Sequence, residues 1–542
     1  MIPARSNSLT KSMAFPAAAA TAFLLALAMP GGKGWWPLLF VALVPLLFSL
    51  RCLSPLQSGC TGLLCGVLYH INMLHWISNV LEKYGGLHPW LAVCVLLLLV
   101  LYMASYTALF CLLLNFMASS TGKKDISSTT ILLVAPVVWV GLDFLRSVLF
   151  TGMPWMDLGY GLFQQPLLIQ AADIGGHHLL TFSIVQINTL FFWLLCIKEK
   201  DRHHYLYAIV ICILLYGIGG YSCMRYRQIT SILSSGDQAE VAVIQGNIDQ
   251  SKKWSPGMKE KTVSKYLELS EGVVKKTDKI DLLVWPETAL PFYPAREPLM
   301  NHIRNFSRKK RVYLLTGSPY FTVVPDKKRP VEYFNSALLL DRLGHLVGRY
   351  NKQHLVPFGE YVPLRTYLWF VKPLVELVGD FTPGNSSIPL KAEKISAGVL
   401  ICFESIFPEI SRRQVVGGAN LLVSMTNDAW YGRSSAPYHS WAMTVMRAVE
   451  NKRSLVRAAN TGISGFVEPT GVIRTELPLF EAAAQDERMV LLTEQTIYTR
   501  GGHWFGNFCS VLILILLYWS ARKRQLIDKK KISRRKLRFG KR

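Results

Sequence analysis

The uneven distribution of apolar residues is the feature that most restricts the fold of this chain. Residues 12 to 222 are almost entirely apolar runs of membrane-spanning length, whereas residues 228 to 500 have the mixed composition of a soluble domain. A chain of 542 residues is also long enough for two or more domains. We therefore predict four parts: an α-helical transmembrane module (1 to 225), a soluble domain (228 to 500), a C-terminal transmembrane helix (504 to 520) and a basic tail (521 to 542).

The apolar runs predict about eight transmembrane helices, near residues 12 to 30, 35 to 50, 57 to 79, 88 to 117, 129 to 150, 178 to 197, 204 to 222 and 504 to 520. The first run also resembles a signal peptide, because basic residues precede it and Ala26-Leu27-Ala28 matches a small-residue cleavage site. We interpret it as an uncleaved helix, since another apolar segment follows almost immediately. Cleavage would not change the orientation of the later helices.

Basic residues predict the orientation of these helices in the membrane. Every second flank carries Lys or Arg, whereas the long loop from Thr151 to His177 carries none. Because positive flanks stay on the cytoplasmic side, the soluble domain is expected outside the cytoplasm. The basic flanks are marked by Arg5, Lys11, Arg51, Lys123, Lys124, Lys198, Lys200, Arg202 and the C-terminal tail.

The net charge of +24 could suggest a nucleic-acid partner, but the position of the charge argues against it. Twelve Lys and Arg residues fall in residues 522 to 542, directly after the last apolar run. A basic segment at this place is typical of a cytoplasmic anchor that contacts anionic lipid headgroups. We therefore expect a membrane partner and no nucleic acid.

The soluble region alternates short apolar runs with helical patterns, which predicts an α/β domain. Helices are expected at 256 to 277 and 437 to 452, and polar residues, Glu287 among them, stand where several strands end. Ligands bind at the carboxyl ends of strands in such sheets, so we expect a site that contains Glu287 and Cys402. The predicted strands are 239 to 247, 280 to 287, 312 to 318, 336 to 341, 397 to 404, 420 to 428 and 488 to 495.

Three side chains near these strand ends are candidates for chemistry, and each has a plainer alternative. Cys402 is the lone cysteine of the soluble region, which excludes a disulfide within it but leaves open an inert buried thiol. Glu287 follows a strand and a proline, which suits a general base, although a glutamate at a helix start fits the sequence equally well. Lys352 follows another strand-like run, and a surface lysine is the alternative there.

A thiol, a carboxylate and an ammonium together could carry out acyl transfer. Glu287 would take the thiol proton and the thiolate of Cys402 would attack a carbonyl carbon. Lys352, with the backbone N–H of Phe403, would stabilise the oxyanion that develops. The product would be a thioester on Cys402 that a second nucleophile resolves.

Three motifs in this order, "WPET", "NKQHLVPFGEYVP" and "CFES", resemble the nitrilase (carbon-nitrogen hydrolase) superfamily. Within it the chain is most similar to the membrane-bound apolipoprotein N-acyltransferase family, over nearly its whole length. The resemblance implies a nitrilase-like αββα domain with about seven helices before it and one after it. It also implies that Glu287 is the general base, Lys352 the oxyanion-stabilising lysine and Cys402 the nucleophile.

The resemblance extends to residues around this triad. Glu360 in "FGEY" resembles the second glutamate that supports the family's site, and Glu404 the acidic residue just after the nucleophile. Trp254 and Asn335 lie in segments similar to those near the family's substrate pocket. Phe403 is a departure, because an aromatic hydroxyl is common at that position in the family.

The family activity implied is transfer of a fatty acyl chain from a membrane phospholipid to the α-amino group of a diacylglyceryl apolipoprotein's N-terminal cysteine. The implied location is the bacterial inner membrane, with the catalytic domain facing the periplasm. No cofactor or metal is expected, since the twelve histidines show no metal-binding spacing. The apolar segment 360 to 384 is either a core helix or an arm that enters the outer leaflet and guards acyl entry.

Two other functions fit parts of the sequence. A membrane-tethered amidase or nitrilase that hydrolyses a small amide would use the same triad, with water resolving the acyl-enzyme. A transporter or membrane scaffold would use the soluble domain only for binding, and Asp143 with Arg146 is the main charged pair inside a predicted span. A lone ion pair near the end of a span is more often structural, which favours the enzyme.

Overall fold

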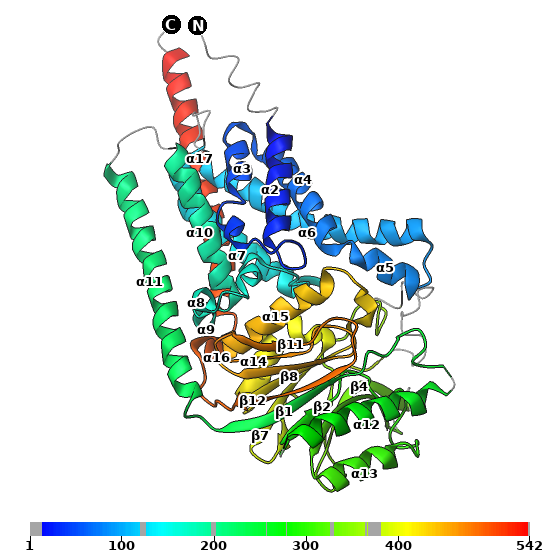
Figure 1. Ribbon diagram of the computed structural model, residues 1–542. Helices are drawn as coiled ribbons and strands as arrows, with labels where there is room; N and C mark the ends of the chain where they lie inside the picture. Colours follow the sequence, from blue (N-terminus) through cyan, green and yellow to red (C-terminus); the bar gives the residue numbers. More distant parts are fainter. Residues whose placement is uncertain are drawn as a thin grey trace.

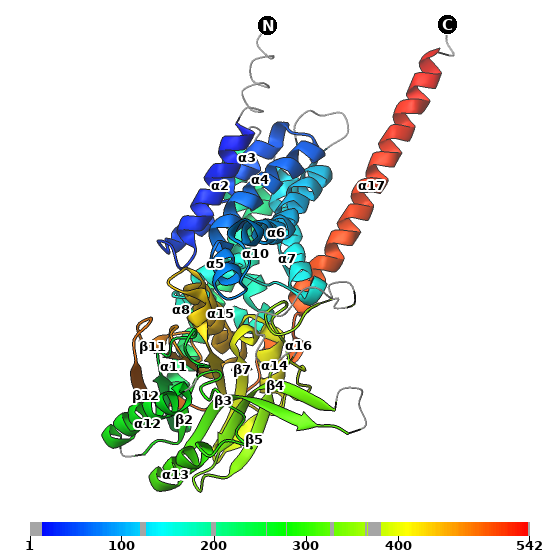
Figure 2. The same cartoon turned by 90° about the vertical axis from the view of Figure 1, so that its right-hand side faces the viewer.

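The computed structural model describes residues 13–119, 126–196, 202–255, 257–277, 279–325, 330–363, 366 and 381–539. Most of the predicted apolar segment 360 to 384 therefore lies outside the described residues. The described chain forms a bundle of helices at one end and a two-sheet domain at the other (Figure 1). Helix α17 (Trp504–Phe539) extends away from the sheets, and Figure 2 shows that much of it stands apart from the bundle.

Five helices in the described residues are long and apolar enough to cross a membrane, or six if the pair α4 (Pro55–Leu74) and α5 (Trp76–Lys83), bent by 52°, counts as one span. The first two predicted spans correspond to the shorter apolar segments Ala14–Ala28 (α2) and Trp36–Cys52, so length and composition do not reach the predicted count of eight. Prolines and glycines in "PGGKGWWP" separate these two segments and interrupt helical hydrogen bonding. The five long apolar helices are α6 (Pro89–Ala118), α7 (Ser128–Val148), α10 (His177–Cys196), α11 (Arg202–Leu233) and α17.

Glycines bring α4 and α6 into close contact inside the bundle. A Cβ atom at Gly62 would lie 2.6 Å from the carbonyl oxygen of Thr107, and one at Gly66 would lie 2.8 Å from Cα of Ala104. Both distances are shorter than a carbon atom tolerates, so a larger residue would push the helices apart. Small residues at helix contacts are the usual means of close packing in membranes.

The soluble domain contains two six-stranded sheets. The first has the order β12-β1-β2-β3-β4-β5, with β1, β2 and β3 parallel, and the second has the order β11-β10-β9-β8-β7-β6, with β7, β8 and β9 parallel. The strands of the first sheet are β1 (Gln238–Gln245), β2 (Leu282–Val284), β3 (Tyr313–Val323), β4 (Val331–Leu340), β5 (Leu346–Asn351) and β12 (Ala483–Val490). Those of the second are β6 (Leu390–Ala392), β7 (Ile395–Ile401), β8 (Leu421–Thr426), β9 (Ser454–Ala459), β10 (Gly465–Val467) and β11 (Ile473–Glu476).

Helices cover the outer face of each sheet, giving four layers. Helices α12 (Met258–Lys276) and α13 (Met300–Lys310) pack on the first sheet, and α14 (Pro408–Val416) and α15 (Ala436–Asn451) lie on the second (Figure 1). Apolar side chains of the two sheets form a separate core between them. The parallel strands are therefore buried on both faces, as their apolar sequences predict.

Helix α15 is shared by the soluble domain and the helical bundle. Its Trp441 and Val445 belong to the core beneath the second sheet, whereas Met443 and Met446 belong to the core of the bundle. All four side chains are buried. The bundle and the sheets are therefore joined by continuous apolar packing.

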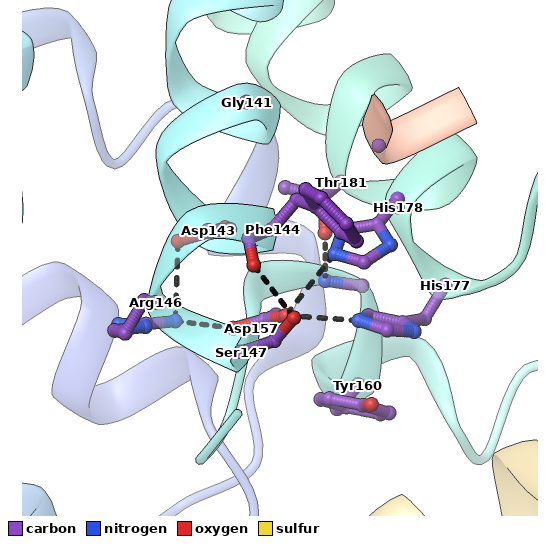
Figure 3. A network of polar contacts seen from close by, with 12 residues as sticks. Gly141, Asp143, Phe144, Arg146, Ser147, Asp157, Tyr160, His177, His178 and Thr181 are labelled. Carbon is purple, nitrogen blue, oxygen red and sulfur yellow. Dashed lines mark hydrogen bonds and ion pairs between the residues drawn. The ribbon is translucent and has the colours of Figure 1, made fainter. Parts of the chain in front are cut away.

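A buried polar network strengthens this junction (Figure 3). Asp157, in the loop after α7, forms an ion pair with Arg146 and a hydrogen bond of 2.8 Å with Nε2 of His177. Nδ1 of His177 in turn lies 3.1 Å from Oε1 of Glu450 on α15. Arg146 also pairs with Asp143 at 3.1 Å, so the charged pair that the sequence indicated is not isolated: it belongs to a network that reaches the soluble domain.

Candidate active site

The three candidate catalytic residues follow the ends of strands in both sheets. Glu287 lies in a turn just after β2, Lys352 directly follows β5, and Cys402 directly follows β7. Glu287 is thus not at a helix start, and Lys352 is buried rather than on the surface, so both plainer alternatives were wrong. The site lies where the two sheets meet.

Lys352 joins two carboxylates. Its Nζ atom lies 3.0 Å from Oε1 and 2.9 Å from Oε2 of Glu360, and 3.6 Å from Oε1 of Glu287. Burial lowers the pKa of Lys352, but Glu360 and Glu287 outweigh burial and hold the pKa above its ordinary value. Lys352 therefore keeps a positive charge at a fixed position.

Asn335 holds the same two carboxylates in place. Its Nδ2 atom donates to Oε1 of Glu287 at 2.8 Å and to Oε1 of Glu360 at 2.9 Å. The second oxygen of Glu287 accepts a hydrogen bond of 2.9 Å from the backbone N–H of Asn427, at the end of β8. Strands from both sheets thus orient Glu287, and the predicted neighbours Glu360 and Asn335 lie in contact with the candidate triad.

Cys402 stands at a sharp turn between β7 and the 3₁₀ helix η5 (Cys402–Ile406). Its φ of 52° is in the left-handed region, which non-glycine residues seldom adopt. Burial raises the pKa of the thiol to about 12, with Glu287 raising it further and Lys352 lowering it. The thiol is therefore protonated at neutral pH. It is partly buried, and the charges of Glu287 and Lys352 act on it.

Glu404 links the segment that carries Cys402 to the segment that carries Lys352. Its Oε2 accepts from the N–H of Ile401 at 2.7 Å, and its Oε1 accepts from the N–H of Gln353 at 2.6 Å and from the hydroxyl of Tyr350 at 2.9 Å. These partners flank Cys402 and Lys352. Burial raises the pKa of Glu404 to about 7, against the lowering effect of its hydrogen bonds. Its geometry is that of a positioning residue.

Phe403 faces the helical bundle with two aromatic neighbours. Its ring centroid lies 5.0 Å from that of Phe407 and 5.7 Å from that of His354, and the ring packs against the core of the bundle. The ring fills apolar space without a hydroxyl. Cys402, which precedes Phe403, is therefore adjacent to the contact between the soluble domain and the bundle.

Lys253 is a candidate residue that the sequence motifs did not indicate. It lies next to the predicted Trp254, which is partly buried in the turn after β1, but its own side chain is fully buried. Among the described residues its Nζ atom has no hydrogen-bond partner. Burial lowers the pKa of Lys253 to about 8, while Glu287 acts to raise it. Nothing in "QSKKW" distinguishes this lysine from the exposed Lys252 before it.

The chain is similar to known proteins over most of its length. Residues 21–190 match the model of the apolipoprotein N-acyltransferase N-terminal domain, and residues 240–491 match the carbon-nitrogen hydrolase model. The chain is 40% identical to an apolipoprotein N-acyltransferase of Geobacter metallireducens, over 90% of this chain and 91% of that one. It is 30% identical to one of Photobacterium profundum, over 92% and 95% of the two chains.

The chain belongs to the apolipoprotein N-acyltransferase family. Membership confirms the resemblance that the three motifs indicated. The N-terminal match ends at residue 190, within α10, and the hydrolase match spans both sheets, so each part of the family model corresponds to one part of the fold.

One group in the described residues has metal-ligand geometry, but its chemistry does not favour a metal. Ligand atoms of Asp157, His177 and His178 all lie within 4.8 Å of one another. However, Asp157 already pairs with Arg146, and His177 already bridges Asp157 and Glu450. A further cation would be repelled by Arg146, so in this apolipoprotein N-acyltransferase family member the group is a structural ion-pair network.

Proposed function

We propose that this chain transfers a fatty acyl chain from a membrane phospholipid to the α-amino group of the N-terminal diacylglyceryl-cysteine of apolipoproteins. The observation that carries the proposal is that the charges of Glu287 and Lys352, 3.6 Å apart, both act on Cys402, while the adjacent Phe403 packs against the core of the helical bundle. The names of the relatives supply the acceptor class. A lipid donor is consistent with a nucleophile segment that packs against membrane-spanning helices.

In the first half-reaction Glu287 takes the proton of Cys402, whose raised pKa requires a base. The thiolate attacks the ester carbonyl of the phospholipid. Lys352 and the backbone N–H of Phe403 stabilise the oxyanion. When the C–O bond breaks, Glu287 returns the proton to the glycerol oxygen, which leaves a lysophospholipid and a thioester on Cys402.

In the second half-reaction the acceptor amine attacks the thioester carbonyl. Glu287 removes the proton of the attacking amine, and Lys352 again stabilises the oxyanion. When the C–S bond breaks, Glu287 gives this proton to the sulfur, which leaves an amide on the acceptor and restores the Cys402 thiol and the Glu287 carboxylate. Because one nucleophile serves both substrates in turn, the kinetics are ping-pong.

The membrane setting supports lipid substrates. Residues of η5 and α14, such as Ile406 and Ile410, are buried in the same core as the transmembrane helices. We assign the protein to the bacterial inner membrane with the catalytic domain on the periplasmic side, on the strength of the basic flanks. We also assign α2 and Trp36–Cys52 to the bilayer, since both pack within the bundle, which gives eight membrane segments.

A reconstituted transfer assay tests this function. Proteoliposomes that contain acyl-labelled phospholipid and a diacylglyceryl-cysteine peptide should yield N-acylated peptide, and Cys402→Ala should yield none. Cys94→Ala is the matched control, because Cys94 is exposed on the membrane helix α6. Transfer by the Cys402→Ala variant would contradict the proposal, and release of free fatty acid without transfer would indicate a hydrolase instead.

A further inference from the structure

The helical bundle contains a cavity that has no role in the proposed mechanism. Its walls come from α2, α4, α6 and α7 and from the loop after α7. The volume of the cavity is about 30 Å³, which is room for about two water molecules. Four polar side chains among those that line it are Tyr69 on α4, Asp143 and Arg146 on α7, and Asp157 in the loop.

The ion pairs of Arg146 leave part of its guanidinium group without a partner. The same nitrogen, Nη2, contacts both carboxylates, Asp143 at 3.1 Å and Asp157 in the pair drawn in Figure 3. Nε of Arg146 and Oδ2 of Asp143 have no hydrogen-bond partner in the part of the chain that the structure describes. Both side chains are more than nine-tenths buried, and buried polar groups without hydrogen bonds cost folding free energy.

Tyr69 lines the same cavity from a different helix. Its side chain is also more than nine-tenths buried, and its hydroxyl has no hydrogen-bond partner among the described residues. A tyrosine hydroxyl both donates and accepts, whereas Nε–H of Arg146 only donates and Oδ2 of Asp143 only accepts. Two helices thus bring unpaired donors and acceptors to one cavity.

Charge and size restrict what this cavity can hold. Arg146 would repel a cation, and Asp143 and Asp157 would repel an anion. An acyl chain would leave the polar atoms of Tyr69, Asp143 and Arg146 without hydrogen bonds. Water is neutral, small enough for the volume, and able both to donate and to accept. Buried water molecules typically make about three hydrogen bonds to groups of this kind.

We propose that the cavity is a binding site for ordered water, which completes the hydrogen bonding of Tyr69, Asp143 and Arg146. The water links α4 to the network that runs from Arg146 through Asp157 to Glu450 on α15. The contact between the bundle and the soluble domain therefore includes a hydrated polar centre inside the membrane module. This site is independent of the proposed function.

Radiolytic footprinting of the full chain in lipid nanodiscs tests for water at this place. An X-ray pulse makes hydroxyl radicals from water, and they oxidise a methionine where water lies beside its sulfur. Met156 lines the cavity, whereas Met103 on α6 is outside its lining, and both side chains are buried. We expect Met156 to be oxidised severalfold faster than Met103. Equal rates for the two methionines would overturn the proposal.

A variant that fills the cavity shows whether the oxidation comes from this water. Cys65 on α4 lines the cavity, so the larger side chain of Cys65→Leu should displace the water. Oxidation of Met156 should then fall to the rate of Met103. If Cys65→Leu does not fold, Thr107→Leu, on the α6 wall, is measured in its place. An unchanged Met156 rate in the folded variant would overturn the proposal.

The thermal stability of Tyr69→Phe gives an independent test, because its sign depends on the water. If water binds the hydroxyl, its removal deletes a hydrogen bond and should lower Tm by about 1 to 3 °C. If the cavity is dry, the substitution removes an unpaired polar group and Tm should rise. Tyr216→Phe, at an exposed position on α11, is the matched control and should leave Tm unchanged. A higher Tm for Tyr69→Phe would overturn the proposal.

Discussion

Lys352 is held by Glu360 rather than by Glu287: Nζ lies within 3.0 Å of both Glu360 oxygens, but 3.6 Å from the nearest Glu287 oxygen. This difference divides the work of the two carboxylates. Glu360 fixes the cation, and Glu287 keeps one oxygen oriented by Asn335 and the other by the N–H of Asn427. In the proposed mechanism Glu287 exchanges protons with a thiol, an alcohol and an amine in turn, and these two hydrogen bonds fix the orientation in which it does so.

Glu360→Gln tests whether Lys352 depends on that anchor. The substitution removes the charge that holds Nζ, so we expect acylation to fall by about 10² to 10³, the usual effect of losing an oxyanion donor. The measurement is the rate of thioester formation in a single turnover. Glu268→Gln, on the exposed face of α12, is the matched control and should leave the rate unchanged. A Glu360→Gln rate within twofold of the wild type would show that Lys352 needs no anchor.

Two variants, Glu287→Gln and Lys352→Met, should distinguish the role of Glu287 in proton transfer from the role of Lys352 in stabilising negative charge. Because Glu287 raises the pKa of Cys402, its neutralisation should not slow alkylation of the thiol by iodoacetamide at alkaline pH, although acylation falls by about 10² to 10⁴. Lys352 lowers that pKa, so Lys352→Met should slow both reactions. Alkylation is measured on the Cys402 peptide by mass spectrometry. Equal loss of alkylation in both variants would argue against the division of roles.

The raised pKa of Glu404 should make the unfolding free energy of the protein depend on pH. Its pKa rises from 4.5 to about 7 in the folded protein, so the folded state binds the proton more tightly than the unfolded chain. The resulting stabilisation is present in full below the unfolded pKa and is lost as pH rises through about 7. It amounts to about 3 kcal/mol at most.

Glu404→Gln removes this proton binding. The unfolding free energies of wild type and variant are measured by denaturation in detergent between about pH 5 and about pH 8. The unfolding free energy of the wild type should fall relative to that of the variant as the pH rises. Parallel stability profiles for the two proteins would contradict the raised pKa.

The junction between bundle and soluble domain should depend on Glu450. Oε1 of Glu450 accepts from the backbone N–H and Nδ1 of His177 and from Arg447, each at 3.1 Å and all buried. Glu450→Gln leaves buried positive groups without their anion, and we expect a loss of about 3 to 5 kcal/mol in unfolding free energy. The exposed pair Lys259–Glu297 is the control, since Glu297→Gln should cost less than about 1 kcal/mol. Similar losses in both variants would mean that the network does not stabilise the junction.

The apolar pattern predicted most of the sheet framework but not all of it. Apolar runs such as "DLLVW" and "NLLVSM" indicated β2 and β8. Strand β9 was not predicted, because Arg457 interrupts its apolar sequence. That arginine is fully buried and reaches Asp428 at 2.7 Å, a long-range pairing that no local pattern reveals. The strands β6 and β10, with three residues each, are too short for a periodicity.

The residues of the candidate site that lie in recognisable sequence motifs could be predicted. "WPET", "NKQHLVPFGEYVP" and "CFES" indicated Glu287, Lys352 and Cys402 together with Glu360 and Glu404. Lys253 was not predictable, because its burial depends on the packing of the turn after β1 against the second sheet. The association of Asp143 and Arg146 with Glu450, more than 300 residues later, likewise exists only in three dimensions.

The most direct test of the mechanism is a search for the acyl-enzyme. The purified protein is incubated with acyl-labelled phospholipid, and mass spectrometry is used to look for a hydroxylamine-sensitive adduct on Cys402. We predict that the adduct forms, that Cys402→Ala lacks it, and that a diacylglyceryl-cysteine peptide discharges it with transfer of the label to the peptide amine. Acyl transfer that proceeds with no adduct on Cys402, or an adduct that the peptide does not discharge, would contradict a Cys402 thioester as the intermediate.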